Sequence, residues 1–188
     1  MKKIAIFASG SGSNFQAIVD AVKRGQIKAD ICLLVCDKTK AYAIKRAKNE
    51  NIPTFVFNAK EYMSKEDYEL DILHHLRERE IDFIILAGYM RLIGPTLLGE
   101  FEGRIINIHP SILPAFPGKD AIGQALEARV KVSGVTIHFV DAGMDTGPII
   151  AQKSIDISED ETRESLQKKI HEIEHQLYPS TIQKLLQT

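Results

Sequence analysis

An asparagine and a histidine two residues apart, Asn107 and His109, end the short apolar run Arg104–His109 and are followed directly by Pro110. Side chains at i and i+2 share one face of a strand, so the two are expected to point together, with Cβ atoms about 6–7 Å apart. Asparagine is a fixed hydrogen-bond donor, whereas histidine donates according to its protonation. The pair can hold one small polar group, although a strand-end asparagine and histidine are as often structural as catalytic.

A second polar group lies in the segment Asp141–Pro148, in which Asp141 and Asp145 stand among glycines. Acids beside glycines are typical of turns, and spacing alone favours that interpretation. A partly shielded carboxyl that faces His109 would instead have a raised pKa and could move protons. The pattern leaves both interpretations open.

A loop rich in glycine and serine, Ser9–Asn14, follows the apolar run Lys3–Ala8. Such a loop at the start of a helix offers unpaired N–H groups and the positive end of the helix dipole, which together suit a phosphate. The loop is not a dinucleotide fingerprint, because Phe15 stands at the third glycine position, and it lacks the Gly-Lys-Ser/Thr of a Walker loop. Its place after the first expected strand favours phosphate binding over a merely flexible turn.

The segment His171–His175 matches the pattern H-E-x-x-H of zinc proteases on an expected helix. No histidine, aspartate or glutamate follows it that could supply a third ligand, so we expect no metal. His138 lies within an expected strand and is interpreted as structural. Cys32 and Cys36 are four strand residues apart, roughly 13 Å and too far for a disulfide, so they are expected to be core thiols.

Strands that alternate with helices must position these groups. The expected strands are Lys3–Ala8, Ile31–Cys36, Pro53–Phe57, Phe83–Ala87, Arg104–His109, Val135–Val140 and Pro148–Gln152. The expected helices are Asn14–Lys23, Ala41–Asn51, one capped by Ser64, a short one that begins near Pro95, and Glu161–Leu177. This order predicts a mainly parallel α/β sheet with right-handed crossovers, and the last two strands predict an antiparallel hairpin at its edge.

Composition excludes several classes of function. The 188 residues include 24 basic and 25 acidic ones, a net charge of −1, which does not suggest wrapping nucleic acid or coating a membrane. The sequence contains no run of about 18 apolar residues, which is the length that a helix needs to span a bilayer. The apolar N-terminal stretch is too short for a signal peptide, so we expect a cytoplasmic protein with no nucleic-acid or membrane partner.

At these residues the sequence resembles the phosphoribosylglycinamide formyltransferase family, the folate-dependent transformylases of purine synthesis. The matching blocks run in order along the whole chain: Gly10–Asn14, Leu86–Ile93, Asn107–Ser111 and Asp141–Gly147. The resemblance implies an α/β formyltransferase-like Rossmann-type sheet with helices on both faces, in one domain covering residues 1–188. Its phosphate-binding half would be about 1–100, and its catalytic and folate-binding half about 101–188.

The resemblance also implies roles for particular positions. It assigns catalysis to Asn107, His109 and Asp145, ribonucleotide binding to Gly12, Ser13, Asn14 and Glu174, and folate binding to Lys65, Met90, Arg91, Leu92, Ile93, Asn107 and Asp141. The segment Gly118–Gln124 lacks histidines that relatives carry, and His171 stands where some relatives have glutamine, so neither receives a role. The peptide bond between Leu113 and Pro114 is expected to be cis.

The implied reaction is formyl transfer from 10-formyltetrahydrofolate to the glycine amine of 5'-phosphoribosylglycinamide. The amine attacks the formyl carbon directly, through a tetrahedral intermediate and without a metal. Formyltetrahydrofolate hydrolase and a non-catalytic sugar-phosphate or nucleotide-binding protein are the alternatives. Because the chain starts at the first expected strand and stops after the last helix, we expect neither a tRNA-binding nor a regulatory domain. The resemblance leaves open whether the chain is a monomer or a homodimer.

Overall fold

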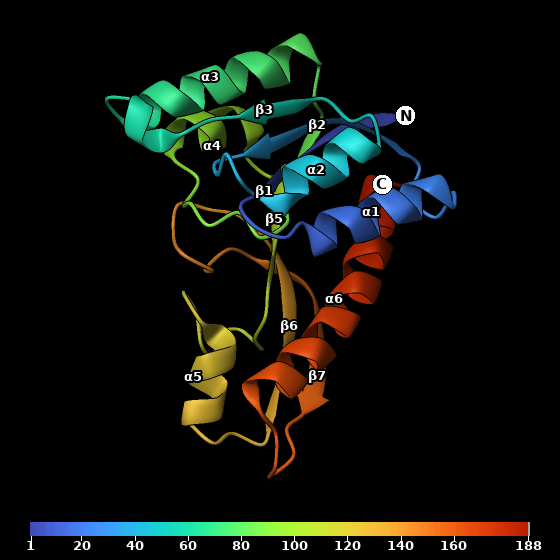
Figure 1. The fold of residues 1–188 in the computed structure, drawn as a ribbon, viewed down its shortest axis with the longest axis vertical. Helices are drawn as coiled ribbons and strands as arrows, with labels where there is room; N and C mark the ends of the chain where they lie inside the picture. The colour runs from blue at the N-terminus through green and yellow to red at the C-terminus, as the bar shows by residue number, and fades with distance from the viewer. Residues whose placement is uncertain (188) are drawn as a thin grey trace.

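A seven-stranded sheet with helices on both faces forms the centre of the computed structural model, which describes residues 1–187 (Figure 1). The strands are β1 (Lys2–Ala8), β2 (Ala29–Cys36), β3 (Thr54–Val56), β4 (Phe83–Leu86), β5 (Ile105–His109), β6 (Val132–Phe139) and β7 (Ile149–Asp156). The helices are α1 (Ser13–Lys23), α2 (Tyr42–Asn49), α3 (Lys65–Glu78), α4 (Pro95–Phe101), α5 (Ala121–Glu127) and α6 (Arg163–Leu186), with a short 3₁₀ turn at Ala59–Glu61.

The strand order β3-β2-β1-β4-β5-β6-β7 confirms the predicted fold class. Strands β1 to β5 pair in parallel, whereas β6 is antiparallel to both β5 and β7. The strand order reverses between β1 and β4, where the chain turns from one half of the sheet to the other. In open α/β sheets, ligands bind outside the carboxyl ends of the strands at such a reversal.

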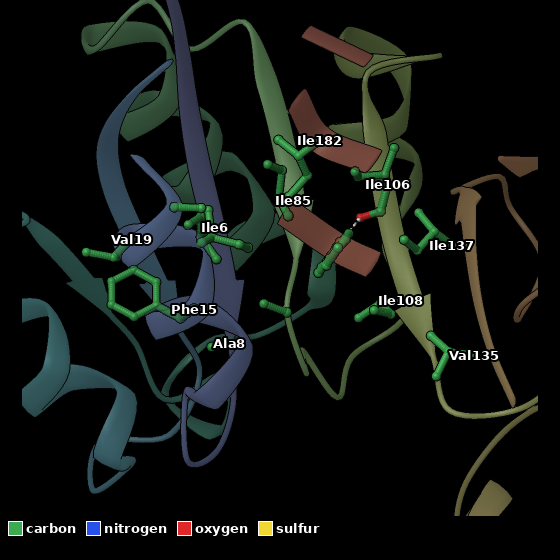
Figure 2. Close-up of a cluster of buried hydrophobic side chains, with 14 of the residues drawn as sticks. Ile6, Ala8, Phe15, Val19, Ile85, Ile106, Ile108, Val135, Ile137 and Ile182 are labelled. Atoms are coloured by element: carbon green, nitrogen blue, oxygen red, sulfur yellow. Dashed lines mark hydrogen bonds between the residues drawn. The ribbon is translucent and has the colours of Figure 1, made fainter. Parts of the chain in front are cut away.

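Alternating side chains on the central strands build two apolar layers. Ile4 and Ile6 of β1 point into a layer shared with α1, α2 and α6, whereas Ala5 and Phe7 point into a layer shared with α3 and α4. Figure 2 shows Ile6 on the same side of the sheet as Phe15 of α1. Both faces of the central strands are therefore covered, which is why these strands read as continuous apolar runs.

Two predicted helix boundaries have different outcomes. Ser64 caps α3, as predicted, because its side chain accepts a hydrogen bond from the Asp67 N–H at 3.2 Å. The predicted end of the last helix at Leu177 is wrong, since α6 continues through Pro179 to Leu186. Proline in a helix costs about 3 kcal/mol. Here Tyr178, Pro179 and Thr181 are buried, and the Tyr178 hydroxyl donates to the Leu86 carbonyl oxygen of β4 at 2.6 Å, so packing against the sheet offsets that cost.

The structure also tests the expectations for the Leu113–Pro114 bond, for the two cysteines and for a membrane span. The bond between Leu113 and Pro114 is cis, as expected. Both cysteines are free, but Cys36 alone is buried and Cys32 is partly exposed, so the expectation of two core thiols is wrong for Cys32. Within residues 1–187, no helix is long and apolar enough to cross a membrane.

Candidate active site

A cavity of about 570 Å³ opens at the carboxyl ends of β4 and β5. Its walls combine apolar side chains with a small set of polar and charged ones. The lining includes Met90, Arg91, Leu92, Ile93, Asn107, His109, Asp120, His138, Asp145, Arg163 and Glu174. A concave, largely apolar site with a few convergent polar groups is the usual form of a small-molecule site.

His109 ends β5 and contacts two hydrogen-bond acceptors. Its Nε2 is 2.8 Å from the Phe116 carbonyl oxygen, and its Nδ1 is 3.5 Å from Asp145 Oδ2. A carbonyl oxygen only accepts, so Nε2 carries a proton, and Nδ1 can donate to the carboxylate when it is protonated. Asn107 lines the same cavity two residues earlier, as the strand spacing predicts.

Asp145 reaches this pair from the loop between β6 and β7. Its backbone is left-handed, with φ of 56°, and its Oδ2 accepts a hydrogen bond from the Gly118 N–H at 2.8 Å. Burial alone would raise the pKa of Asp145, but the neighbouring His138, the Gly118 N–H and the charge of His109 together lower it. The raised pKa considered for an acid facing His109 is therefore wrong, and Asp145 is ionised at neutral pH.

His138 is a member of this cluster that the sequence did not point to. It lies opposite Asn107 in the pairing of β5 with β6, and its Nε2 is 3.4 Å from Asn107 Nδ2 and 3.7 Å from Asp145 Oδ1. Its Nδ1 donates to the Phe139 carbonyl oxygen at 2.8 Å, which fixes the ring. The interpretation of His138 as merely structural missed this position. Cross-strand register is the signal that would have found it, and one sequence does not give it.

The glycine and serine loop packs tightly against α2. Gly12 is left-handed, with φ of 76°, and a Cβ there would stand 2.8 Å from both Cα and Cβ of Ala43. Arg46 Nε donates to the Ser11 carbonyl oxygen at 2.8 Å, so the loop is held from outside. Ser13 begins α1, and Asn14 Oδ1 is buried without a hydrogen-bond partner among the described residues. The loop thus supplies a rigid helix N-terminus, next to the cavity lining rather than within it.

Glu174 links this loop to the cavity. It is 5% exposed on α6, and burial raises its pKa to about 7, an effect that a hydrogen bond with Asn14 partly opposes. His171 Nε2 is 3.9 Å from Glu174 Oε1, and the rings of His171 and His175 stack with centroids 6.0 Å apart. Among the described residues no group of three or more potential ligands could hold a metal ion.

The segment Met90–Ile93 forms one wall of the cavity, where the resemblance places the folate. Two other residues that the resemblance assigns to the folate do not line it. Lys65 Nζ donates to the Leu92 carbonyl oxygen at 2.5 Å, so Lys65 supports that wall from behind. Asp141 is exposed and binds its own loop, accepting from Thr146 Oγ1 at 2.6 Å and from the Gly143 N–H at 3.0 Å.

Helix α5, which the sequence did not predict, covers the opposite wall. Asp120 caps it by accepting from the Gly123 N–H at 3.2 Å, and it also forms an ion pair of 2.6 Å with Arg163 of α6. Both Asp120 and Arg163 line the cavity. The segment Gly118–Gln124, which received no role, therefore closes the site and joins it to α6.

Comparison with known proteins gives one consistent result. The formyl transferase family model matches residues 2–182. The phosphoribosylglycinamide formyltransferase of Bacillus subtilis (strain 168) is 57% identical over 99% of this chain and 95% of that protein. The trifunctional purine biosynthetic protein adenosine-3 of Drosophila melanogaster is 40% identical over 98% of this chain, which corresponds to only 14% of that protein.

Solved structures agree with the sequence relatives. Phosphoribosylglycinamide formyltransferase from Bacillus halodurans superposes with a TM-score of 0.97 at 57% identity, over 98% of this chain and 95% of that one. Glycinamide ribonucleotide transformylase 1 from Geobacillus kaustophilus also gives 0.97, at 60% identity and over 99% of both chains.

Proposed function

We infer that this chain, which belongs to the phosphoribosylglycinamide formyltransferases of the formyl transferase family, transfers a formyl group from 10-formyltetrahydrofolate to 5'-phosphoribosylglycinamide. The acceptor is the glycine amine, and the product is formylglycinamide ribonucleotide in purine biosynthesis. The alternative of a non-catalytic sugar-phosphate or nucleotide-binding protein does not account for this membership. The other activities of the trifunctional relative are not carried over, because this chain matches only one part of it.

One observation carries the proposed mechanism, which is the meeting of Asn107, His109 and Asp145 in one cavity. The 3.5 Å between His109 Nδ1 and Asp145 Oδ2 is what a charged pair needs, and a sugar-phosphate sensor would not require it. The cavity fits a folate in size, because its 570 Å³ is within the range of roughly 300–1,000 Å³ for sites of drug-sized ligands.

Asn107 and His109 stabilise the negative charge that develops on the formyl oxygen during attack. Asn107 Nδ2 is a donor whose other neighbour is His138, 3.4 Å away. His109 Nε2 donates to the Phe116 carbonyl oxygen in this structure, so its proposed role requires that hydrogen bond to be exchanged for one to the formyl oxygen. Removal of one such donor costs about 3–4 kcal/mol of transition-state stabilisation.

Asp145 supports the charged form of His109 and accepts the proton of the attacking amine, directly or through water. Its lowered pKa keeps it ionised at neutral pH, which suits the support of a charged His109. The tight contacts from Gly118 and His138 hold the carboxylate in one orientation. Orientation of both substrates against these groups supplies several further kcal/mol of the barrier reduction.

The two substrates occupy different ends of one formyltransferase domain, residues 1–188. In the half of about 1–100, Gly12, Ser13 and Asn14 bind the ribonucleotide phosphate at the N-terminus of α1. Glu174 of α6, from the other half, contacts the same sugar-phosphate substrate. In the half of about 101–188, the catalytic groups face the folate wall Met90–Ile93, which is contributed by the first half. Lys65 and Asp141 act on the folate through this wall and through the 141–145 loop.

The site draws only on residues of one chain, so a monomer or a homodimer can carry it, and the location we propose is the cytoplasm. Sedimentation of the purified protein distinguishes the two oligomeric states. The function itself is tested by a formyl-transfer assay with 10-formyltetrahydrofolate and three acceptors. Transfer to glycinamide ribonucleotide, with none to water or methionyl-tRNA, is the expected result. Preferred transfer to water would instead identify a formyltetrahydrofolate hydrolase.

A further inference from the structure

Directly after β2 lies a buried carboxylate, Asp37, that has no part in the proposed mechanism. The Asp37 side chain is 1% exposed, and both of its oxygens are engaged. Oδ1 accepts from Ser9 Oγ at 2.5 Å, and Oδ2 accepts from Arg91 Nε at 2.8 Å. The Ser9 oxygen in turn accepts from the Met90 N–H at 2.9 Å. One carboxylate therefore connects the start of the phosphate loop to the folate wall.

The connection crosses three adjacent strands at the edge where the site lies. Ser9 follows β1, Asp37 follows β2, and Met90 and Arg91 follow β4. The strand order reverses between β1 and β4, so the hydrogen bonds bridge the point at which the two halves of the sheet part. A shift of the Met90–Arg91 backbone relative to β1 would break this set of hydrogen bonds.

The contact with Asp37 also fixes the direction of the Arg91 guanidinium. Arg91 lines the cavity and its side chain is 30% exposed, and its Tyr68 contact places the guanidinium carbon 5.7 Å from the ring centroid. The bond to Asp37 uses Nε, so the terminal nitrogens can reach both Tyr68 and a ligand in the cavity. A guanidinium held in this way presents preorganised donors, which suits a carboxylate.

We propose that Asp37 is a positioning residue for the folate co-substrate. It aims Arg91 at an anionic group of that molecule and, through Ser9, it holds the Met90 backbone in the wall against which the folate lies. Asp37 does not touch either substrate. The proposal rests on the proposed function, since it assumes that the wall Met90–Ile93 binds 10-formyltetrahydrofolate.

Two variants separate the contributions of hydrogen bonding and of charge. Asp37→Ala removes both acceptors, and we expect the KM for 10-formyltetrahydrofolate to rise about tenfold or more. The kcat and the KM for the ribonucleotide should stay within about threefold. Asp37→Asn keeps one acceptor oxygen for Arg91 Nε, so its KM should rise only about threefold. If Asp37 only stabilised the fold, its removal would not raise the KM for 10-formyltetrahydrofolate while leaving the KM for the ribonucleotide nearly unchanged.

The direct test is a double-mutant cycle with Arg91. In an Arg91→Ala background, Asp37→Ala should raise the folate KM by a smaller factor than it does in the wild type, because only its hold on Met90 through Ser9 remains. Glu100→Ala is the matched control, since it breaks an exposed arginine ion pair of 2.5 Å with Arg77 outside the cavity, and it should leave both KM values unchanged.

The outcomes are decisive in either direction. An unchanged folate KM in Asp37→Ala, an equal rise in both KM values, or an undiminished effect in the Arg91→Ala background would overturn the proposal. If Asp37→Ala does not fold, Asp37→Asn decides, and a folate KM equal to that of the wild type would refute positioning. A wild-type protein without formyl transfer would instead refute the proposed function, which keeps the two failures apart.

Discussion

Replacement of Glu174 by glutamine should make the protein more stable at neutral pH and hardly change it under acidic conditions. Glu174 is 5% exposed, and burial raises its pKa from 4.5 to about 7. The folded state therefore holds a proton between pH 4.5 and about 7 that the unfolded state releases. The free energy of unfolding of the wild type falls as pH rises through that window.

The magnitude follows from the two pKa values. Each step of 1 in pKa corresponds to about 1.4 kcal/mol, so burying the ionised carboxylate costs about 3 kcal/mol once the pH is well above 7. Glutamine has nearly the same shape and does not titrate. Between pH 5 and pH 8 the variant should therefore gain about 2.5 kcal/mol relative to the wild type.

Urea unfolding of both proteins at pH 5, 6, 7 and 8 measures this difference. His171, whose Nε2 is 3.9 Å from Glu174 Oε1, is present in both proteins, and burial lowers its pKa. Glu172→Gln on the same helix is the matched control, because it removes an exposed carboxylate rather than a buried one. A Glu174→Gln difference that stays constant across this range would refute the reasoning.

Three further predictions concern the loop and the catalytic cluster. Gly12→Ala forces a Cβ to within 2.8 Å of Ala43 at a positive φ, so it should lower the free energy of unfolding by more than about 1 kcal/mol in urea titrations. Asn14→Ala should raise the KM for the ribonucleotide and leave the KM for 10-formyltetrahydrofolate unchanged, and a change in the folate KM alone would contradict the loop assignment. His138→Ala removes a neighbouring imidazole that lowers the pKa of Asp145, so the acidic limb of the pH–rate profile should move to higher pH, and an unmoved limb would contradict this.

The sequence predicted the elements whose signals are local. The cap at Ser64 and the apolar run that ends at His109 lie within a few residues of the features that they determine, and both predictions are confirmed. These local signals therefore suffice to place Asn107 and His109 at the carboxyl end of a strand, where a site is expected. Family resemblance, rather than spacing, pointed to Asp145, because two acids among glycines are equally typical of a turn.

Features set by long-range packing were not predicted. The continuation of α6 past Pro179 depends on burial against the sheet, which helix propensity does not report. His138 enters the site through the pairing of β6 with β5, and a single sequence does not define that register. Asp37 likewise gains its partners from two strands distant in sequence, Ser9 being 28 residues and Arg91 54 residues away.

The proposed catalysis of formyl transfer by Asn107, His109 and Asp145 is best tested with the single-turnover rate of Asp145→Asn. Asparagine tolerates the left-handed backbone of this position and retains the size of the side chain, so the fold should persist. With both substrates saturating, we expect a folded protein whose transfer rate falls by at least about a hundredfold. A folded variant that transfers the formyl group at the wild-type rate would contradict it.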